Sequence, residues 1–148
     1  MYEKEFSPAL EDTIFYQLDK SIKSYRQFAQ QRIKQAGLNV TVDQWLVLKT
    51  LYDHSGLNQR DLASRVFKDH GSITRMLELL IRKGFVSRTV LASDRRNHKI
   101  YLSKKGLAIC LQLFSVVADY RAQALQGISE KEQKLFRNLL DKMTENCR

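Results

Sequence analysis

The sequence predicts a mainly α-helical protein with a small β-hairpin wing, in which a winged helix-turn-helix is flanked by long helices at both ends. Apolar residues recur at three- and four-residue steps along most of the 148 residues, which is typical of helices that bury one face. Two closely spaced helix signals lie between Asn58 and Gly84, and the segment from Phe85 to Leu102, FVSRTVLASDRRNHKIYL, reads as two strand-like runs around a polar tip.

The first predicted helix is long and ends near Gly37, because glycine is a common helix stop. The apolar face of this helix consists of Leu10, Ile14, Leu18, Ile22, Tyr25, Phe28, Ala29 and Ile33. This face needs a partner to cover it.

The second helix begins at a capping box, T-x-x-Q, formed by Thr41 and Gln44, and Gly56 stops it. Its apolar residues are Trp45, Leu46, Leu48 and Leu51.

A helix-turn-helix follows. Asn58 caps a short helix that carries Leu62, Ala63 and Val66, and the small Ala63 lies where two helices must approach closely. Asp69 caps the next helix, which ends at Gly84 and is expected to point Ile73, Met76, Leu77, Leu80 and Ile81 inward.

The opposite side of that last helix carries small and hydrogen-bonding residues around one arginine: His70, Gly71, Ser72, Thr74 and Arg75. Such a surface could enter a major groove, with Arg75 reaching a guanine or a phosphate. The alternative is an ordinary solvated helix face.

In the hairpin, alternation places Ile100 and Leu102 inward and Lys99 and Tyr101 outward, with the turn at 93–97. Arginines at the tip have the length and charge to enter a minor groove. Asp94 could hold the guanidinium of Arg96, or could simply favour the turn.

The basic residues are concentrated around this hairpin. From Arg82 to Lys105 there are eight basic residues and one acid, so the segment holds +7 of the chain's net charge of +9. These residues are Arg82, Lys83, Arg88, Asp94, Arg95, Arg96, Lys99, Lys104 and Lys105. A surface that meets a polyanion explains this excess; a solvated basic face and an anionic membrane are the alternatives.

After the hairpin, Ser103-Lys104-Lys105-Gly106 begins a long helix, and a second capping box at Ser129 and Glu132 begins the last one. Apolar positions on or near one face of these helices are Leu107, Leu111, Phe114, Val117, Tyr120, Ala124 and Leu125, then Leu135, Phe136, Leu139, Leu140 and Met143. This is more apolar surface than a winged helix-turn-helix can cover, which favours a two-fold dimer over an intrachain bundle.

Composition argues against several other classes. No apolar run is long enough to span a bilayer, and the N-terminus is acidic where a signal peptide would be basic, so we expect a soluble, cytosolic protein. Cys110 and Cys147 have no CxxC spacing, and no histidine has metal-ligand spacing. We expect no metal, no cofactor and no enzymatic activity, because a phosphate loop and a nucleophile with a base beside it are also missing from the pattern.

Five segments, in this order and spacing, make the chain resemble the MarR-type transcriptional regulators from about Leu10 onward. They are TVDQW from Thr41, GLNQRDLA from Gly56, SITR from Ser72 with GFV from Gly84, DRR from Asp94, and LSKKG from Leu102.

The resemblance implies a homodimer with two winged domains on successive turns of duplex DNA. Residues 1–37 and 104–148 would form the dimerisation region and 38–103 the DNA-binding region, in one continuous fold. By position, Ser72, Thr74 and Arg75 would meet the major groove, Arg96 the minor groove with Asp94 as its ion-pair partner, and Arg95 and Lys99 the phosphates; His70 and Arg88 complete the expected DNA-binding set.

The chain departs from the family at two positions: Gly71 stands where a serine or other polar residue is common, and Asn58 replaces the more usual threonine cap. Family members often bind small lipophilic or phenolic effectors, or sense oxidants through an early cysteine; here none precedes Cys110. Tyr16, Trp45, His54 and Tyr120 could line a pocket, but nothing in the sequence selects among them.

The sequence therefore predicts a repressor that binds a pseudo-palindromic operator as a homodimer and is released by a small molecule. The alternatives are a non-specific architectural DNA- or RNA-binding protein, and a redox-sensing regulator that uses Cys110 or Cys147.

Overall fold

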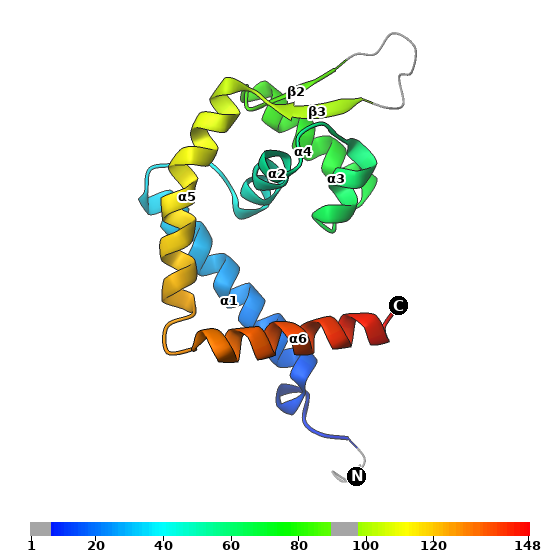
Figure 1. Cartoon of the computed structure of the whole chain (residues 1–148), viewed down its shortest axis with the longest axis vertical. Helices are drawn as coiled ribbons and strands as arrows, with labels where there is room; N and C mark the ends of the chain where they lie inside the picture. Colours follow the sequence, from blue (N-terminus) through cyan, green and yellow to red (C-terminus); the bar gives the residue numbers. More distant parts are fainter. Residues whose placement is uncertain (1–6, 90–97) are drawn as a thin grey trace.

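The computed structural model describes residues 7–89 and 98–148. Along the chain it has a short 3₁₀ helix η1 (Leu10–Asp12), α1 (Ile14–Gln35), α2 (Val42–Asp53), β1 (Leu57–Asn58), α3 (Gln59–Arg65), α4 (His70–Arg82), β2 (Val86–Arg88), β3 (Lys99–Leu102), α5 (Lys104–Ala124) and α6 (Glu130–Asn146). In Figure 1, α2, α3, α4 and the three strands form one lobe, called here the winged lobe, while α1, α5 and α6 extend away from it. The predicted fold class is confirmed.

The predicted helix starts are present as side-chain caps. The hydroxyl of Thr41 accepts a hydrogen bond from the Gln44 backbone N–H at 3.1 Å, and Ser129 and Glu132 form the equivalent box at α6. Asn58, Asp69 and Ser103 cap α3, α4 and α5 in the same way. Each cap satisfies a backbone donor that the first turn of a helix leaves without a partner.

The sheet has one strand more than the sequence predicted. The strand order is β1-β3-β2 with antiparallel neighbours, Leu57 pairs with Ile100, and Val86 pairs with Leu102. The two-residue β1 is too short to leave an alternating pattern, and its partner lies more than forty residues away. Ile100, in the central strand, is fully buried and Lys99 is exposed, as alternation predicted.

The core joins the winged lobe to the long helices. It contains the C-terminal half of α1, one side of α2, the inner side of α4 and a line along α5 made of Gly106, Cys110, Leu113, Val117 and Tyr120. The expectation that Ile81 points inward was wrong, since 37% of it is exposed and Leu80 takes the inward position. On α5, Leu107 and Leu111 face outward, because the helix packs through the line that includes Cys110.

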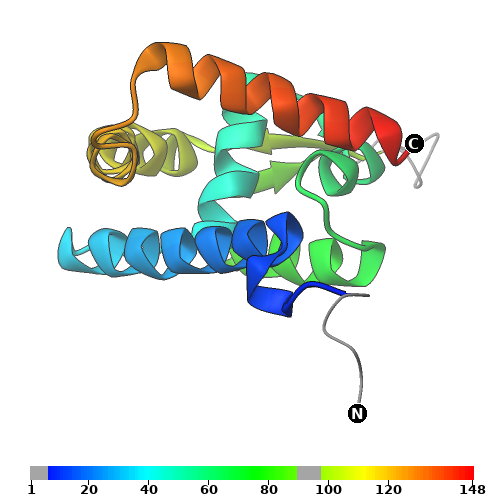
Figure 2. The ribbon, with the colours of Figure 1, turned by 90° about the horizontal axis from the view of Figure 1, so that it is seen from below.

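The terminal helices keep apolar side chains on the surface of the single chain. Leu10, Ile14 and Phe15 are each more than 60% exposed, and α6 has no buried residue at all. Figure 2, seen from below, shows α1 and α6 as two separate arms.

Candidate nucleic-acid interface

The first turn of α4 is held by Asp69, the residue before the helix. Its carboxylate accepts a hydrogen bond from the Ser72 backbone N–H at 2.7 Å. That bond, with a smaller attraction from Arg75, holds the pKa of Asp69 below its ordinary value. A carboxylate that stays ionised keeps the turn rigid and complements the positive end of the helix.

The two sides of α4 differ sharply. Ile73, Leu77 and Leu80 are fully buried, which fixes the rotation of the helix in the winged lobe. His70 and Arg75 are then exposed, while Ser72 and Thr74 are half-buried beside them. The structure therefore brings the four predicted α4 residues together on the outer side of the helix.

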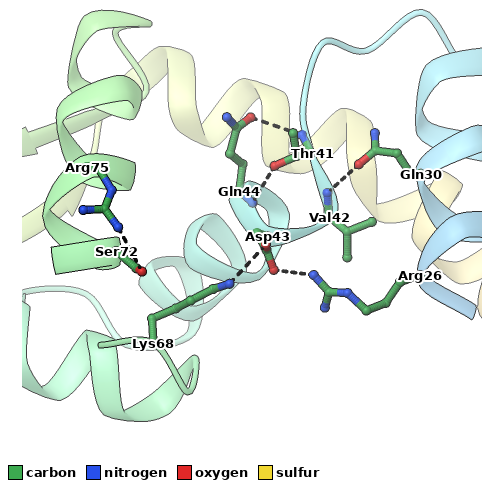
Figure 3. Close-up of polar contacts among 9 residues, drawn as sticks. All are labelled: Arg26, Gln30, Thr41, Val42, Asp43, Gln44, Lys68, Ser72 and Arg75. Carbon is green, nitrogen blue, oxygen red and sulfur yellow. Dashed lines mark hydrogen bonds and ion pairs between the residues drawn. The ribbon is translucent and has the colours of Figure 1, made fainter. Parts of the chain in front are cut away.

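Arg75 lies back along the first turn of its own helix. One of its nitrogens, Nη2, donates to the Ser72 hydroxyl at 3.3 Å (Figure 3). Gly71 leaves space beside it, since a Cβ there would lie 3.4 Å from the Arg75 Nη1 atom.

The base of the hairpin carries the two other predicted cations that the structure describes. Arg88 ends β2 and Lys99 begins β3, and both side chains are exposed. The Thr89 N–H donates to the Lys99 carbonyl at 3.0 Å, so the ladder continues one residue beyond β2. Asp94, Arg95 and Arg96 lie outside the described residues.

Gln59, the first residue of α3, was not among the residues predicted from the sequence. Its side-chain Nε2 donates to the Thr74 Oγ1 atom at 2.6 Å and ties α3 to the outer side of α4. The available signal was weak: a polar residue in the first turn of the helix that crosses α4 is compatible with simple exposure.

An ion-pair network that was not predicted from the sequence joins α1 to the turn before α4. Both carboxylate oxygens of Asp43, in the first turn of α2, are engaged: Arg26 of α1 donates to one, and the Lys68 Nζ donates to the other at 3.1 Å (Figure 3). Burial raises the pKa of Asp43, but the hydrogen bonds from Arg26 and Lys68 outweigh it and hold the pKa below its ordinary value. No local pattern pairs these three residues, because the contacts are tertiary.

A hollow of about 280 Å³ lies between α2 and α5. Its wall includes a cluster of three aromatic rings. Phe114 packs edge-to-face against Trp45 and Tyr52, with ring centroids 5.9 and 5.0 Å apart. Lys49 and Arg121 are the basic residues of this wall, and the Lys49 ammonium lies 5.2 Å from the centre of the Tyr52 ring. Of the pocket candidates considered from sequence, Trp45 is in this wall, while Tyr120 is buried in the core.

The described residues offer neither a metal site nor a membrane-spanning helix. Within 7–89 and 98–148, no three His, Cys, Asp or Glu side chains gather as metal ligands would. None of the helices described has the length and apolar character needed to cross a membrane.

Comparison with known proteins agrees with this architecture. Residues 40–98, which span most of the winged lobe, match the family model described as "MarR family". A probable transcriptional regulator from Pseudomonas aeruginosa is 26% identical, with a TM-score of 0.81 over 91% of this chain and 99% of that one. MepR of S. aureus, solved as a complex with DNA, is also 26% identical, with a TM-score of 0.81 over 90% of this chain and 98% of its own.

A third structure shares the fold at lower identity. BpsR of Bordetella bronchiseptica, whose DNA binding is described as regulated by 6-hydroxynicotinic acid, is 19% identical, with a TM-score of 0.83 over 93% of this chain and 97% of that one. Residues 40–98 therefore carry a match to the MarR family, and the chain as a whole shares the fold of solved transcriptional regulators, one of them a MarR-family regulator from Silicibacter pomeroyi.

Proposed function

We propose that the chain is a sequence-specific DNA-binding repressor that acts without enzymatic activity. The observation that carries the proposal is the geometry of α4, whose apolar side is locked in the core while its outer side presents Ser72, Thr74 and Arg75 beside a basic hairpin. An outer side of this kind suits a helix that lies in a major groove. The structure of MepR with DNA supports the same use of the fold here.

The proposed contacts divide by the groove that they meet. His70, Ser72, Thr74 and Arg75 meet the major groove, while Arg88, Arg95 and Lys99 bind phosphates. Arg96 enters the minor groove and Asp94 orients it. The exposure of Arg88 and Lys99 at the base of the hairpin supports this division.

The operator-binding form is a homodimer, in which residues 1–37 and 104–148 form the dimerisation region and 38–103 the DNA-binding region. The apolar side chains that the single chain leaves on its terminal helices support this, with Ile14 61%, Leu135 59% and Phe136 53% exposed. Exposed apolar surface on this scale marks an interaction site. Two-fold symmetry then requires a pseudo-palindromic operator with half-sites about one helical turn apart.

A small aromatic effector releases the dimer from DNA. The hollow between α2 and α5 supports this part of the proposal, because its aromatic wall suits a lipophilic or phenolic molecule and Arg121 lies beside it, while Lys49 is paired with Asp53. The hollow lies where α5 meets the winged lobe. A bound molecule could therefore have different affinities for two positions of the winged lobe relative to α5.

Redox sensing through Cys110 is the weaker alternative. Cys110 is fully buried, and burial raises the pKa of its thiol to about 11. The thiolate is the reactive form of cysteine, and because the pKa of Cys110 is raised, little thiolate exists near neutral pH.

The test uses a duplex recovered from a random library by the wild-type protein. Fluorescence anisotropy should show a loss of affinity of about 10- to 100-fold for Arg75→Ala on this duplex, and little change on a scrambled duplex. The matched control is Arg148→Ala, which removes the same charge from an exposed site in the last residue of the chain. Equal losses in both variants, or equal losses on both duplexes, would reduce the role of Arg75 to general electrostatic attraction.

A further inference from the structure

The proposed DNA contacts leave part of the basic segment between Arg82 and Lys105 without a role. Arg82 and Lys83 lie at the C-terminal end of α4, and Lys105 lies in the first turn of α5. Arg82 follows Arg75 by seven residues, which is about 10 Å along a helix, so it lies well beyond the turn that the proposed function places in the major groove. Within residues 7–89 and 98–148, none of these three cations forms an ion pair with an acidic side chain.

The same three cations line one hollow of about 540 Å³, which is separate from the hollow between α2 and α5. Its apolar lining comes from Leu38 and Val40 in the linker between α1 and α2, from Phe85 before β2, and from Ile109 on α5. No aspartate or glutamate is among the described residues that line it. The hollow therefore combines apolar surface with positive charge that no acid offsets.

The ammonium group of Lys83 is held at this hollow by neutral acceptors. Its Nζ donates to the Asn39 carbonyl at 3.0 Å and to the Gln44 Oε1 atom at 3.3 Å. Lys83 is half-buried and Gln44 is buried, so the charge is partly removed from water. An ammonium group has three N–H donors, and two are used by acceptors in the described part of the chain. An anion beside this group would offset the loss of hydration.

Lys105 has neutral neighbours as well. Its Nζ donates to the Lys83 carbonyl at 3.0 Å and lies 5.4 Å from the centre of the Phe85 ring. These contacts hold a second ammonium group beside the apolar lining without neutralising it. Two positioned cations and a nearby apolar surface are the features that recognise an acid with an apolar body.

We infer that this hollow binds a small organic anion, whose carboxylate lies at Lys83 and Lys105 and whose apolar body lies against Leu38, Phe85 and Ile109. An inorganic anion would leave the apolar lining in water, and a neutral apolar molecule would leave the two ammonium groups without an anion. The occupant would contact the linker between α1 and α2, the end of α4 and the start of α5 at once. The inference goes beyond the proposed function and does not depend on DNA binding.

The experiment is a titration of the full chain followed by ¹H–¹⁵N correlation spectra. Octanoate is the probe, octanamide is the matched probe without charge, and acetate is the matched probe without an apolar body. Gly37 lines this hollow, so its amide signal reports binding there. Trp45 is the one tryptophan of the chain and lines the hollow between α2 and α5, so its indole N–H signal reports binding at that second place.

We expect octanoate to shift the Gly37 signal in a saturable manner and to leave the Trp45 indole signal unchanged. Its affinity should exceed those of octanamide and acetate by about tenfold or more, because only octanoate meets both the cations and the apolar lining.

Two pairs of variants locate the site. Lys104 and Lys105 are adjacent and exposed, but only Lys105 lines the hollow. Lys105→Gln should weaken octanoate binding by about threefold to fivefold, and Lys104→Gln by less than about twofold. Ala108 and Ala118 are exposed alanines of α5 that line the two different hollows. Ala108→Glu should weaken octanoate binding by about tenfold or more, because it places a carboxylate among the cations, whereas Ala118→Glu should have little effect.

Four results would overturn the inference. Equal affinities for octanoate and octanamide would show that charge plays no part, and a shift of Trp45 without Gly37 would place the acid in the other hollow. Equal losses in Lys104→Gln and Lys105→Gln would reduce the effect to general attraction. A Gly37 signal that ignores octanoate, with weaker duplex binding in Lys105→Gln, would make these cations phosphate contacts. Failure to enrich any inverted repeat would count against the proposed function alone.

Discussion

Gly106, in the first turn of α5, should not tolerate even a methyl group. A Cβ built on Gly106 would lie 2.0 Å from the carbonyl oxygen of Phe85 and 2.9 Å from its carbonyl carbon. Unbonded atoms in contact normally lie about 3.5 Å apart, so Gly106→Ala requires α5 and the strand end to separate by more than 1 Å. Both neighbours are backbone, which cannot turn aside as a flexible side chain would.

The separation also breaks local hydrogen bonds. The Ser103 N–H donates to the same Phe85 carbonyl at 3.0 Å, and the Ser103 hydroxyl donates to the Gly84 carbonyl. Overpacking typically costs about 1–3 kcal/mol, and each lost hydrogen bond about 0.5–1.5 kcal/mol. Replacing a helical glycine by alanine returns about 0.5–1 kcal/mol. Gly106→Ala should therefore lower the free energy of unfolding by about 1–5 kcal/mol.

Gly71→Ala is the matched control, because Gly71 also lies in the first turn of a helix. A Cβ there meets only Arg75 Nη1 at 3.4 Å and Asp69 Oδ1 at 3.5 Å, which are ordinary contacts. It should leave stability unchanged or raise it by up to about 1 kcal/mol.

Urea unfolding followed by far-UV circular dichroism measures both variants, at one chain concentration because the stability of a dimer depends on it. If Gly106→Ala unfolds within about 0.5 kcal/mol of the wild type, the close approach of α5 to Phe85 is wrong.

Phe67→Asn should raise the free energy of unfolding by about 1 kcal/mol and the Tm by about 2–4 °C. Phe67 has a positive φ of 57°, a backbone conformation that Asn adopts more readily, and Phe67 is 94% exposed, so little packing is lost. An unchanged or lower Tm in calorimetry would contradict this. Asp43→Asn should destabilise the protein by about 1 kcal/mol at pH 7, since its carboxylate holds two cations. The folded pKa of Asp43 is depressed below 3.8, so the advantage of the wild type is present above that pH and lost as the pH falls through the folded pKa. A difference between wild type and Asp43→Asn that stays unchanged as the pH is lowered from 7 until the protein unfolds would count against the network. Iodoacetamide at neutral pH should modify the exposed Cys147 and spare the buried Cys110, so mass spectrometry should show one adduct. Two adducts on the folded protein would show that Cys110 is accessible.

Helix starts and the position of the hairpin could be predicted because their causes are local. Thr41 with Gln44 and Ser129 with Glu132 carry their capping partners three residues away, so the sequence itself contains the contact. The inward residues Ile73 and Leu77 followed equally from helical spacing.

The contacts that connect helices could not be predicted in this way. Gln59 meets Thr74 only after α3 has packed on α4, and Asp43 meets Arg26 and Lys68 only after α2 has packed on α1 and on the turn before α4. Gly106 was predicted only as part of the segment that begins the long helix, and its close approach to the Phe85 backbone is a tertiary contact that no local pattern indicates. The error at Ile81 has a related origin, since Leu80 and Ile81 are adjacent and only packing decides which one faces the core.

In the proposed function, two copies of α4 read a two-fold DNA site. Selection of the purified wild-type protein on a random duplex library, with sequencing of the retained DNA, tests it most directly. We predict enrichment of one inverted repeat whose half-sites lie about one helical turn apart. Recovery of unrelated sequences at comparable yield would contradict the claim, and would leave a basic winged protein that binds nucleic acid without choosing a site.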